Sequence, residues 1–466
     1  MAASNGAASN DSRAARAVET PLTSRDVLAL ALPVMLSNAT TPLVGLVDTA
    51  VIGQLGQAHL MGGVAVAATI FNVLYWGFGF LRLGTTGFTA QAVGAGITSE
   101  IAANLFRPLL IALVLGTAII VARGPITSGA VWLMGGSSAV QATAQSYIDV
   151  RVWSAPAVLI NITLMGWLVG LGRTSFVFLL QVLLNTLNIG LALLFVAGLG
   201  WGVPGAGGAA AIADWTAALA GLGYALSVLR SRGWWAPMAT VLDAHHLKTS
   251  FAVNRDITIR TLCVVGVFSF FVAQAAKAGD LTLAANAALH QLAMVTVYLL
   301  DGFEIAAQTL VGQAVGSREL GRYRASVRLT FLWSAAVGVL MSLILWVAGP
   351  RLIAMMSSNA DVQATARLYL GWAALVPVVG VWCFIYDGFF IGATRGPDLR
   401  NMMLISTAAY VVAWAGLTAV AGNHGLWLAL LVFFTVRAVT LWARMPALQR
   451  DLFGPVTPAL AGATPA

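Results

Sequence analysis

The chain has 466 residues, of which 59% are hydrophobic and 9% are charged, and its formal net charge is +8. Soluble domains carry about 25% charged residues, so this chain could not cover a water-facing surface and is predicted to be a multi-span membrane protein. The positive charge does not predict a nucleic-acid partner. Nearly all of the excess lies in short loops between apolar runs, and the only lysines are Lys248 and Lys277.

Residues 1–24 contain Ala, Ser, Asn and Arg without periodicity and are predicted to form a disordered cytoplasmic tail. No signal-peptide pattern is present, so the first span is expected to remain as an anchor. About twelve segments are then long enough to cross a bilayer, at about 20 residues per crossing. Their approximate ranges are 28–53, 60–92, 104–123, 144–171, 175–197, 206–229, 257–278, 283–314, 325–348, 364–393, 399–421 and 424–447.

The first apolar segment, residues 32–56, contains an acid and two prolines. Asp48 is a candidate functional residue, because a charge near the centre of a membrane helix costs about 2.5–3.5 kcal/mol on insertion scales. Pro33 and Pro42 remove backbone donors and are expected to bend the helix. A bent helix with a buried acid predicts a moving element that responds to protons or other cations.

An internal repeat divides the chain. Gln91-Ala-Val-Gly94 returns as Gln313-Ala-Val-Gly316, each time after a long apolar segment. Two halves of six helices therefore begin on the same side of the membrane, related by an axis along the membrane normal, with a substrate site expected between them. The Arg and Lys residues gather in the loops of one side, so the positive-inside rule predicts that both termini are cytoplasmic.

The predicted fold is thus an all-α membrane protein with twelve transmembrane helices in two six-helix repeats, an N-lobe and a C-lobe, related by a pseudo-two-fold axis. The expected ranges are a cytoplasmic tail at 1–24, the N-lobe at 25–230, a cytoplasmic inter-lobe linker at 231–256, the C-lobe at 257–448 and a second cytoplasmic tail at 449–466.

Further charged residues fall inside the predicted spans. Asp301 and Glu304 are three residues apart and share a helix face, so one of them is expected to hold a proton in a low dielectric. Arg82 aligns with Glu304 through the repeat, which allows a cross-lobe ion pair of either functional or structural kind. Asp387 lies near the end of the tenth predicted span. Asp214 is a secondary candidate, with a plain hydrogen bond to a neighbouring helix as the alternative.

Other classes of site have no support in the sequence. There is no G-x-x-x-x-G-K-[ST] motif for ATP and no His/Cys cluster for a metal. Cys263 and Cys383 lie in apolar segments and are predicted to be small hydrophobic residues. We therefore predict neither an enzyme nor a cofactor. A receptor is also disfavoured, because it has little need of buried acids in both halves.

Several motifs together resemble the multidrug and toxic compound extrusion (MATE) transporters, and most closely their DinF branch. They are V-D-T-A-V-I-G at 47–53, F-T-A-Q-A-V-G at 88–94, A-A-N-A at 284–287, L-D-G-F-E at 300–304 and Y-D-G-F-F-I-G-A-T-R at 386–395. The resemblance covers about residues 25–448. It implies a bacterial inner-membrane exporter of organic cations and related amphiphiles, with alternating access driven by a proton or sodium gradient and no ATP.

The resemblance also implies roles for single residues. Asp48 matches the acid that the family protonates, with bending at Pro33 to follow, and Asn188 matches an Asn of the N-lobe polar network. One turn later the family usually has Asp, whereas this chain has Ala192, so Asp48 would work with fewer partners. The sodium-coupled branch has an acid within the seventh helix. Here only Asp256, at its mouth, is present, which favours protons.

The sequence therefore favours a proton-coupled antiporter. Sodium coupling through Asp301, Glu304 and Asp387 stays open. A lipid-linked-precursor flippase is the other alternative, but it would need a strongly cationic cavity, and only Arg82 and Arg260 lie near the spans. Side chains that could line a substrate cavity, with core packing as the commoner alternative, are Tyr75, Trp76, Met165, Met294 and Tyr298.

Overall fold

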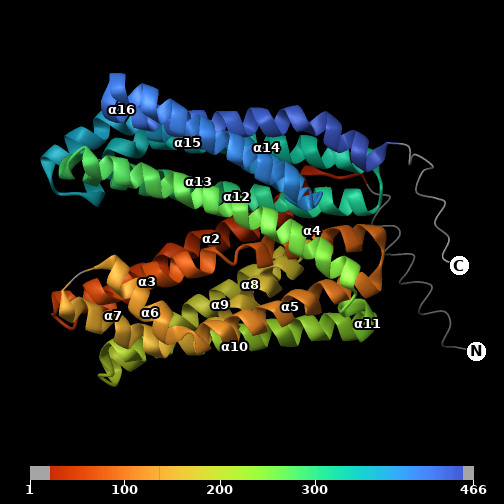
Figure 1. Cartoon of the computed structure of the whole chain (residues 1–466), viewed down its shortest axis with the longest axis horizontal. Helices are drawn as coiled ribbons and strands as arrows, with labels where there is room; N and C mark the ends of the chain where they lie inside the picture. Colours follow the sequence, from red (N-terminus) through yellow and green to blue (C-terminus); the bar gives the residue numbers. More distant parts are fainter. Residues whose placement is uncertain (1–20, 136, 455–466) are drawn as a thin grey trace, which may run out of the picture.

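The computed structural model describes residues 21–135 and 137–454, without the side chains of residues 41–44, 46, 48, 49 and 58. Every regular element in this part of the chain is a helix. The helices form two bundles that approach each other at the end that carries both chain termini and diverge toward the other end (Figure 1). The first bundle contains α2 to α10, and the second contains α12 to α16.

The first bundle consists of α2 (Ser24–Gly53), α3 (Ala58–Trp76), α4 (Phe80–Ala95), α5 (Thr98–Val121), α6 (Arg123–Met134), α7 (Ser138–Arg151), the 3-10 turn η1 (Val152–Ser154), α8 (Ala155–Gly170), α9 (Thr174–Ala192), the π-helical turn η2 (Leu193–Gly198) and α10 (Gly202–Arg232). The short helix α11 (Met238–Val241) connects it to the second bundle. That bundle consists of α12 (Ala244–Lys277), α13 (Asp280–Gly316), α14 (Leu320–Met356), α15 (Ala360–Gly392) and α16 (Gly396–Phe453).

These helices correspond to the predicted spans. Within the described residues, ten helical stretches are long and apolar enough to cross a membrane. The stretch α16 is counted there as one, although Gly422 breaks it with a left-handed backbone (φ 53°, ψ −127°) that glycine tolerates. The first predicted span is α2, which stands outside that count. The predicted all-α fold with twelve spans in two lobes is confirmed.

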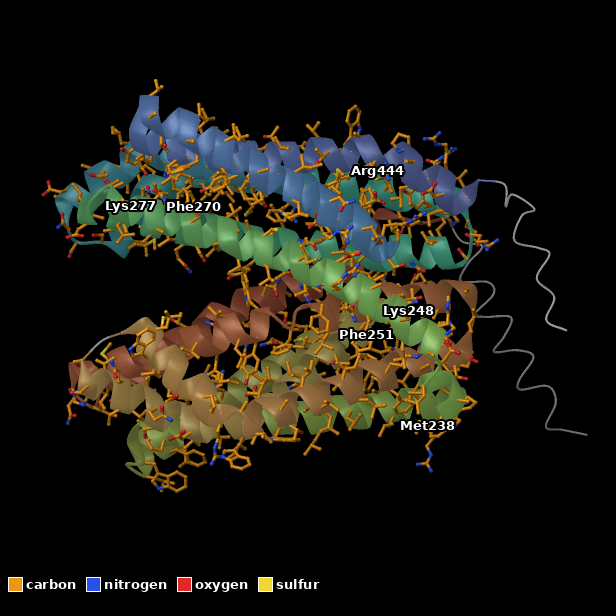
Figure 2. All side chains as sticks on the ribbon, viewed as in Figure 1. Met238, Lys248, Phe251, Phe270, Lys277 and Arg444 are labelled. Atoms are coloured by element: carbon orange, nitrogen blue, oxygen red, sulfur yellow. The ribbon has the colours of Figure 1, made fainter. Side chains whose placement is uncertain are left out.

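The seventh predicted span is longer than its apolar part. Its helix, α12, begins at Ala244 rather than near residue 257, because the Asp243 side chain caps it by accepting from the His246 backbone N–H at 2.8 Å. Figure 2 places Lys248 near the end that carries the termini and Lys277 at the opposite end. Much of the expected linker is therefore helix that extends beyond the apolar segment.

Glycines allow the two bundles to touch where the repeated motif meets its own copy. A Cβ atom on Gly94 would lie 1.9 Å from the Gln313 carbonyl oxygen, and one on Gly316 would lie 2.0 Å from the Gln91 carbonyl oxygen. The Gln91 side chain donates across the same contact to the Gly392 carbonyl oxygen at 2.8 Å. We call these five residues the repeat seam. Close backbone packing of this kind is how small residues join helices in a membrane.

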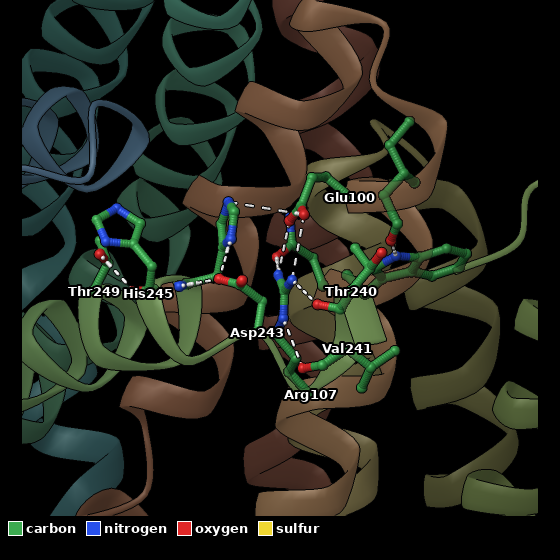
Figure 3. A network of polar contacts seen from close by, with 11 residues as sticks. Glu100, Arg107, Thr240, Val241, Asp243, His245 and Thr249 are labelled. Atoms are coloured by element: carbon green, nitrogen blue, oxygen red, sulfur yellow. Dashed lines mark hydrogen bonds and ion pairs between the residues drawn. The ribbon is translucent and has the colours of Figure 1, made fainter. Parts of the chain in front are cut away.

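Arg107 on α5 binds the segment that joins the bundles (Figure 3). This buried guanidinium contacts the Glu100 carboxylate at 2.7 Å and donates to the carbonyl oxygens of Thr240 and Val241, both in α11. One cation thus satisfies a carboxylate and two carbonyl groups. The connecting segment is docked on the first bundle.

Replacing Arg107 with Met keeps the apolar stem but removes every one of these donors. We expect the free energy of unfolding to fall by about 1.5–3 kcal/mol, the value of a hydrogen-bonded charged group. We also expect faster tryptic cleavage after Arg232 and Lys248, the trypsin sites that flank the segment. SDS titration in mixed micelles and limited trypsinolysis measure the two effects. Arg25→Met, at an exposed position, is the control. Proteolysis at the wild-type rate would contradict the assigned role of Arg107.

Candidate functional site

Charged side chains from four helices meet inside the second bundle. Asp387 on α15 is fully buried, and its Oδ2 accepts from Arg260 Nε on α12 at 2.8 Å, while its Oδ1 accepts from Arg437 Nε on α16 at 3.2 Å. Each guanidinium makes a second contact with Oδ2. Glu304 on α13 is buried too, and its charge interacts with Arg260 and Asp387. Its Oε1 accepts from Gln308 Nε2 at 3.1 Å.

The charges of Arg260, Arg437, Asp387 and Glu304, which we call the C-lobe cluster, balance when Glu304 is ionised. When Glu304 is protonated, the cluster carries one net positive charge. Arginine does not lose its proton in proteins, so both cations are permanent. Buried ions are tolerated only when they are paired and hydrogen-bonded. Because Asp387 already has two guanidinium partners, it has little capacity to bind a further cation.

Two members of the cluster lie where the sequence reasoning did not place them. The orientation argument counted Arg260 and Arg437 with the positive charges of the cytoplasmic side, although their positions fall within the predicted spans 257–278 and 424–447. The structure instead places Arg260 well inside α12 and buries Arg437 in α16, with its side chain 1% exposed. The missed signal was Asp387 itself, because a carboxylate inside a span requires a cationic partner.

Asp301 on α13 faces the first bundle. Its Oδ2 accepts from Asn38 Nδ2 on α2 at 3.0 Å and lies 3.6 Å from Arg82 Nη1 on α4. Asn38 also donates to the Tyr298 carbonyl oxygen at 2.9 Å. The repeat alignment pointed to Glu304 as a partner for Arg82. The structure shows that Arg82 instead forms its cross-lobe ion pair with Asp301. Asp301 and Arg82 both stay partly exposed.

In the first bundle, α9 presents polar side chains to α2. Asn185 Nδ2 donates to Thr40 Oγ1 on α2 at 2.8 Å. Asn188, one turn further along, is buried, and its Oδ1 has no hydrogen-bond partner within the described residues. Ala192, at the family's usual acidic position, is buried as well. Such orphaned acceptors are rare in native interiors and call for an explanation.

Two predicted residues of α2 cannot be placed at the level of side chains. Asp48 and Pro42 lie in the helical backbone, but their side chains are outside the described set. Pro33 lies in the same helix, which runs from Ser24 to Gly53 as one element. The bending expected at Pro33 stays a prediction.

Asp214 on α10 is held by neighbouring helices. Its buried Oδ2 accepts from Ser154 Oγ at 2.9 Å, and its backbone carbonyl oxygen accepts from Asn161 Nδ2 at 2.9 Å. Arg151 is near enough to interact with its charge. This geometry matches the hydrogen-bonding alternative given above for Asp214.

The five aromatic and methionine candidates are not gathered at one place. Tyr75 stacks on Phe71 with ring centroids 5.6 Å apart, and its buried hydroxyl has no partner within the described residues. Trp76 is 49% exposed at the end of α3. Met165 packs against the core of the first bundle. Met294 and Tyr298 lie on α13 in the other bundle.

Comparisons with known proteins agree on one family. The MatE family model matches residues 33–194 and 257–415. The DNA damage-inducible protein F of Escherichia coli (strain K12) is 41% identical over 414 residues, covering 89% of this chain and 90% of the relative. A probable multidrug resistance protein NorM of Rhodopseudomonas palustris is 26% identical, covering 91% of this chain and 92% of the relative.

Solved structures share the fold. A multidrug resistance MATE family transporter of the MOP superfamily, in an outward-facing conformation, superposes with a TM-score of 0.82 at 20% identity, covering 92% of this chain and 97% of that chain. A MOP superfamily transporter from Pyrococcus furiosus gives a TM-score of 0.81 at 20% identity, covering 91% and 96%.

Proposed function

Because the chain belongs to the MatE family of multidrug efflux transporters, we propose that it exports cationic, amphiphilic small molecules in exchange for protons. Members of this family are multi-pass membrane transporters and not enzymes. The proposed setting is a bacterial inner membrane, with both termini in the cytoplasm and with alternating access between the two lobes. The proton gradient supplies the energy for export, and no cofactor is proposed.

We favour protons over sodium because Asp387 already has two cationic partners. A sodium ion at this carboxylate would have to displace Arg260 or Arg437, each a permanent cation held at hydrogen-bond distance. The second bundle is therefore a poor sodium site in this conformation. We therefore assign coupling to the first bundle. Asp387 and Glu304 balance the buried arginines of the second bundle, and Asp301 pairs with Arg82 across the two bundles.

The unpartnered Asn188 supports a proton site at Asp48. An ionised carboxylate only accepts hydrogen bonds, whereas a protonated one donates. Within the described residues the buried Asn188 Oδ1 has no donor, and its helix α9 packs against α2, the helix of Asp48. Protonated Asp48 would supply that donor. Its neutralisation would weaken the hold on a cationic substrate, so protons and substrate compete.

Uptake of an ethidium-like cation into inverted vesicles tests this proposal. We expect uptake when the vesicle interior is acidic, no response to a sodium gradient, and at least a ten-fold loss in Asp48→Asn. Asp280→Asn, at an exposed position in the first turn of α13, is the matched control and is expected to transport normally. Sodium-driven uptake that survives Asp48→Asn would overturn the proposal and move the coupling site to the second bundle.

The flippase alternative has less support. A lipid pyrophosphate would require free cationic groups in a central cavity. Arg260 and Arg437 add buried positive charge, but Asp387 and Glu304 balance it within the C-lobe cluster. Arg82 is engaged with Asp301. If the vesicles accumulate no cation under either gradient, the result favours a lipid substrate.

A further inference from the structure

Helices α14, α15 and α16 of the second bundle line a groove that the proposed transport cycle does not use. One part, of about 880 Å³, lies between the start of α14 and the end of α16. A second part, of about 430 Å³, continues along α15 and α16. Tyr386 and Trp442 line both parts, so the two form one feature.

The first part of the groove is cationic. Its charged lining residues are Arg324 and Arg328, one turn apart on α14, and Arg450 on α16. All three are exposed, and none has an ion-pair partner within the described residues. Their neighbours differ in this respect, because Arg444 and Arg395 are paired with Asp398 and Asp451. The groove therefore presents three positive charges that form no ion pair with a carboxylate of the described residues.

A hydroxyl group adds an independent observation. Tyr323 lines the same part of the groove and is 2% exposed, and its hydroxyl has no hydrogen-bond partner within the described part of the chain. Its ring is held against Phe453, with centroids 5.1 Å apart. Within the described residues, a buried hydroxyl without a hydrogen-bond partner and three guanidinium groups without an ion-pair partner thus line one part of the groove, a combination suited to an anion that accepts hydrogen bonds.

The second part of the groove is apolar. It is lined by side chains such as Val379, Trp382 and Val439, which belong to the middle of the predicted tenth and twelfth spans. Arg324, Arg328 and Arg450 instead stand at the ends of predicted spans. The groove thus changes from cationic at the membrane boundary to apolar toward the membrane interior.

We propose that this groove binds an anionic phospholipid. Its phosphate would contact Arg324, Arg328 and Arg450, with the Tyr323 hydroxyl as a further donor. One acyl chain would lie along Trp442 and Trp382. Guanidinium groups bind phosphate through paired N–H donors, and basic pockets between transmembrane helices at the membrane surface suit acidic headgroups. A zwitterionic lipid would leave the three charges unbalanced, and a soluble anion would leave the apolar part empty.

The test uses the purified, delipidated full-length protein and native mass spectrometry with added lipids. We expect phosphatidylglycerol and cardiolipin to bind at least ten-fold more tightly than phosphatidylcholine. Replacing Arg324, Arg328 and Arg450 together with Gln should abolish this preference. Tyr323→Phe should weaken phosphatidylglycerol binding a few-fold while leaving all three charges in place.

A matched triple variant removes the same charge elsewhere. Arg25, Arg230 and Lys248 are exposed and belong to the start of α2, the end of α10 and the start of α12. Figure 2 places Lys248 near the end of the molecule that carries the termini. Their joint replacement by Gln should leave the lipid preference intact. Equal loss in both triple variants would show general attraction and overturn the site. So would equal binding of phosphatidylcholine, or competition by glycerol phosphate at the same concentration as the lipid.

Discussion

Replacing Arg437 with Leu is expected to lower the free energy of unfolding by about 3–5 kcal/mol, the typical penalty for removing one partner of a buried ion pair. Asp387 keeps Arg260, but Glu304 then lacks a balancing cation in an interior that excludes water. Arg437 also stands over the Phe384 ring at 5.6 Å, so its loss removes packing too. SDS titration of the purified protein in mixed micelles measures the change.

A second substitution separates charge balance from packing. Glu304→Gln removes the carboxylate that Arg437→Leu leaves unbalanced and keeps the side-chain volume. The double variant is therefore expected to recover a large part of the stability lost in Arg437→Leu. Arg444→Leu, at a pair whose arginine side chain is 46% exposed, should cost only about 0–1 kcal/mol. Additive losses in the double variant would mean that the four charges do not act as one cluster.

The sequence predicts the fold well because the bilayer imposes simple rules. A span needs about 20 apolar residues, and a repeated motif indicates two equivalent halves. Each predicted span therefore falls on helical structure, and the break at Gly422 lies between the last two, although the spans 60–92 and 144–171 are each divided into shorter helices. The early start of α12 was not predicted, because its first residues lie outside the apolar segment and only the Asp243 cap indicates them.

Polar partners were harder to predict, because they depend on depth and on helix rotation. Counting positive charges near span ends does not distinguish an exposed arginine from Arg260 or Arg437, which lie in the interior. Asp301 and Glu304 share a broad helix face but differ by about 60° around the axis. That difference turns Asp301 toward Arg82 and Glu304 into the second bundle. Neither fact can be read from spacing alone.

The second large predicted effect is a change in the balance of conformations when the repeat seam is altered. We expect Gly94→Ala and Gly316→Ala each to disfavour this conformation by about 1–3 kcal/mol, the usual range for overpacking a close contact. The added Cβ would lie about 2 Å from a backbone carbonyl oxygen of the other bundle. A carbonyl within a helix cannot turn away as a flexible side chain can. The simplest relief is for the two bundles to separate at this end.

Spin labels on the two bundles measure this separation. Thr98 on α5 and Gly321 on α14 are both exposed, and each is replaced by Cys to carry a label. The native Cys263 and Cys383 are replaced by Ala in every variant. Double electron–electron resonance should show a larger population at long distance in Gly94→Ala and Gly316→Ala. Gly223→Ala and Gly266→Ala raise helix propensity equally, but their added Cβ atoms meet nothing within 4 Å, so they should match the wild type.

The same variants connect the seam to transport. Under the proposed alternating access, the repeat seam closes in one state and opens in the other, so a clash there penalises only the closed state. A penalty of about 1.4 kcal/mol changes the ratio of the two states ten-fold. Transport should therefore slow in Gly94→Ala and Gly316→Ala while each lobe stays folded. Unchanged distances together with unchanged transport would mean that the bundles tolerate the added methyl groups without parting, and that the seam does not set the balance between the two states.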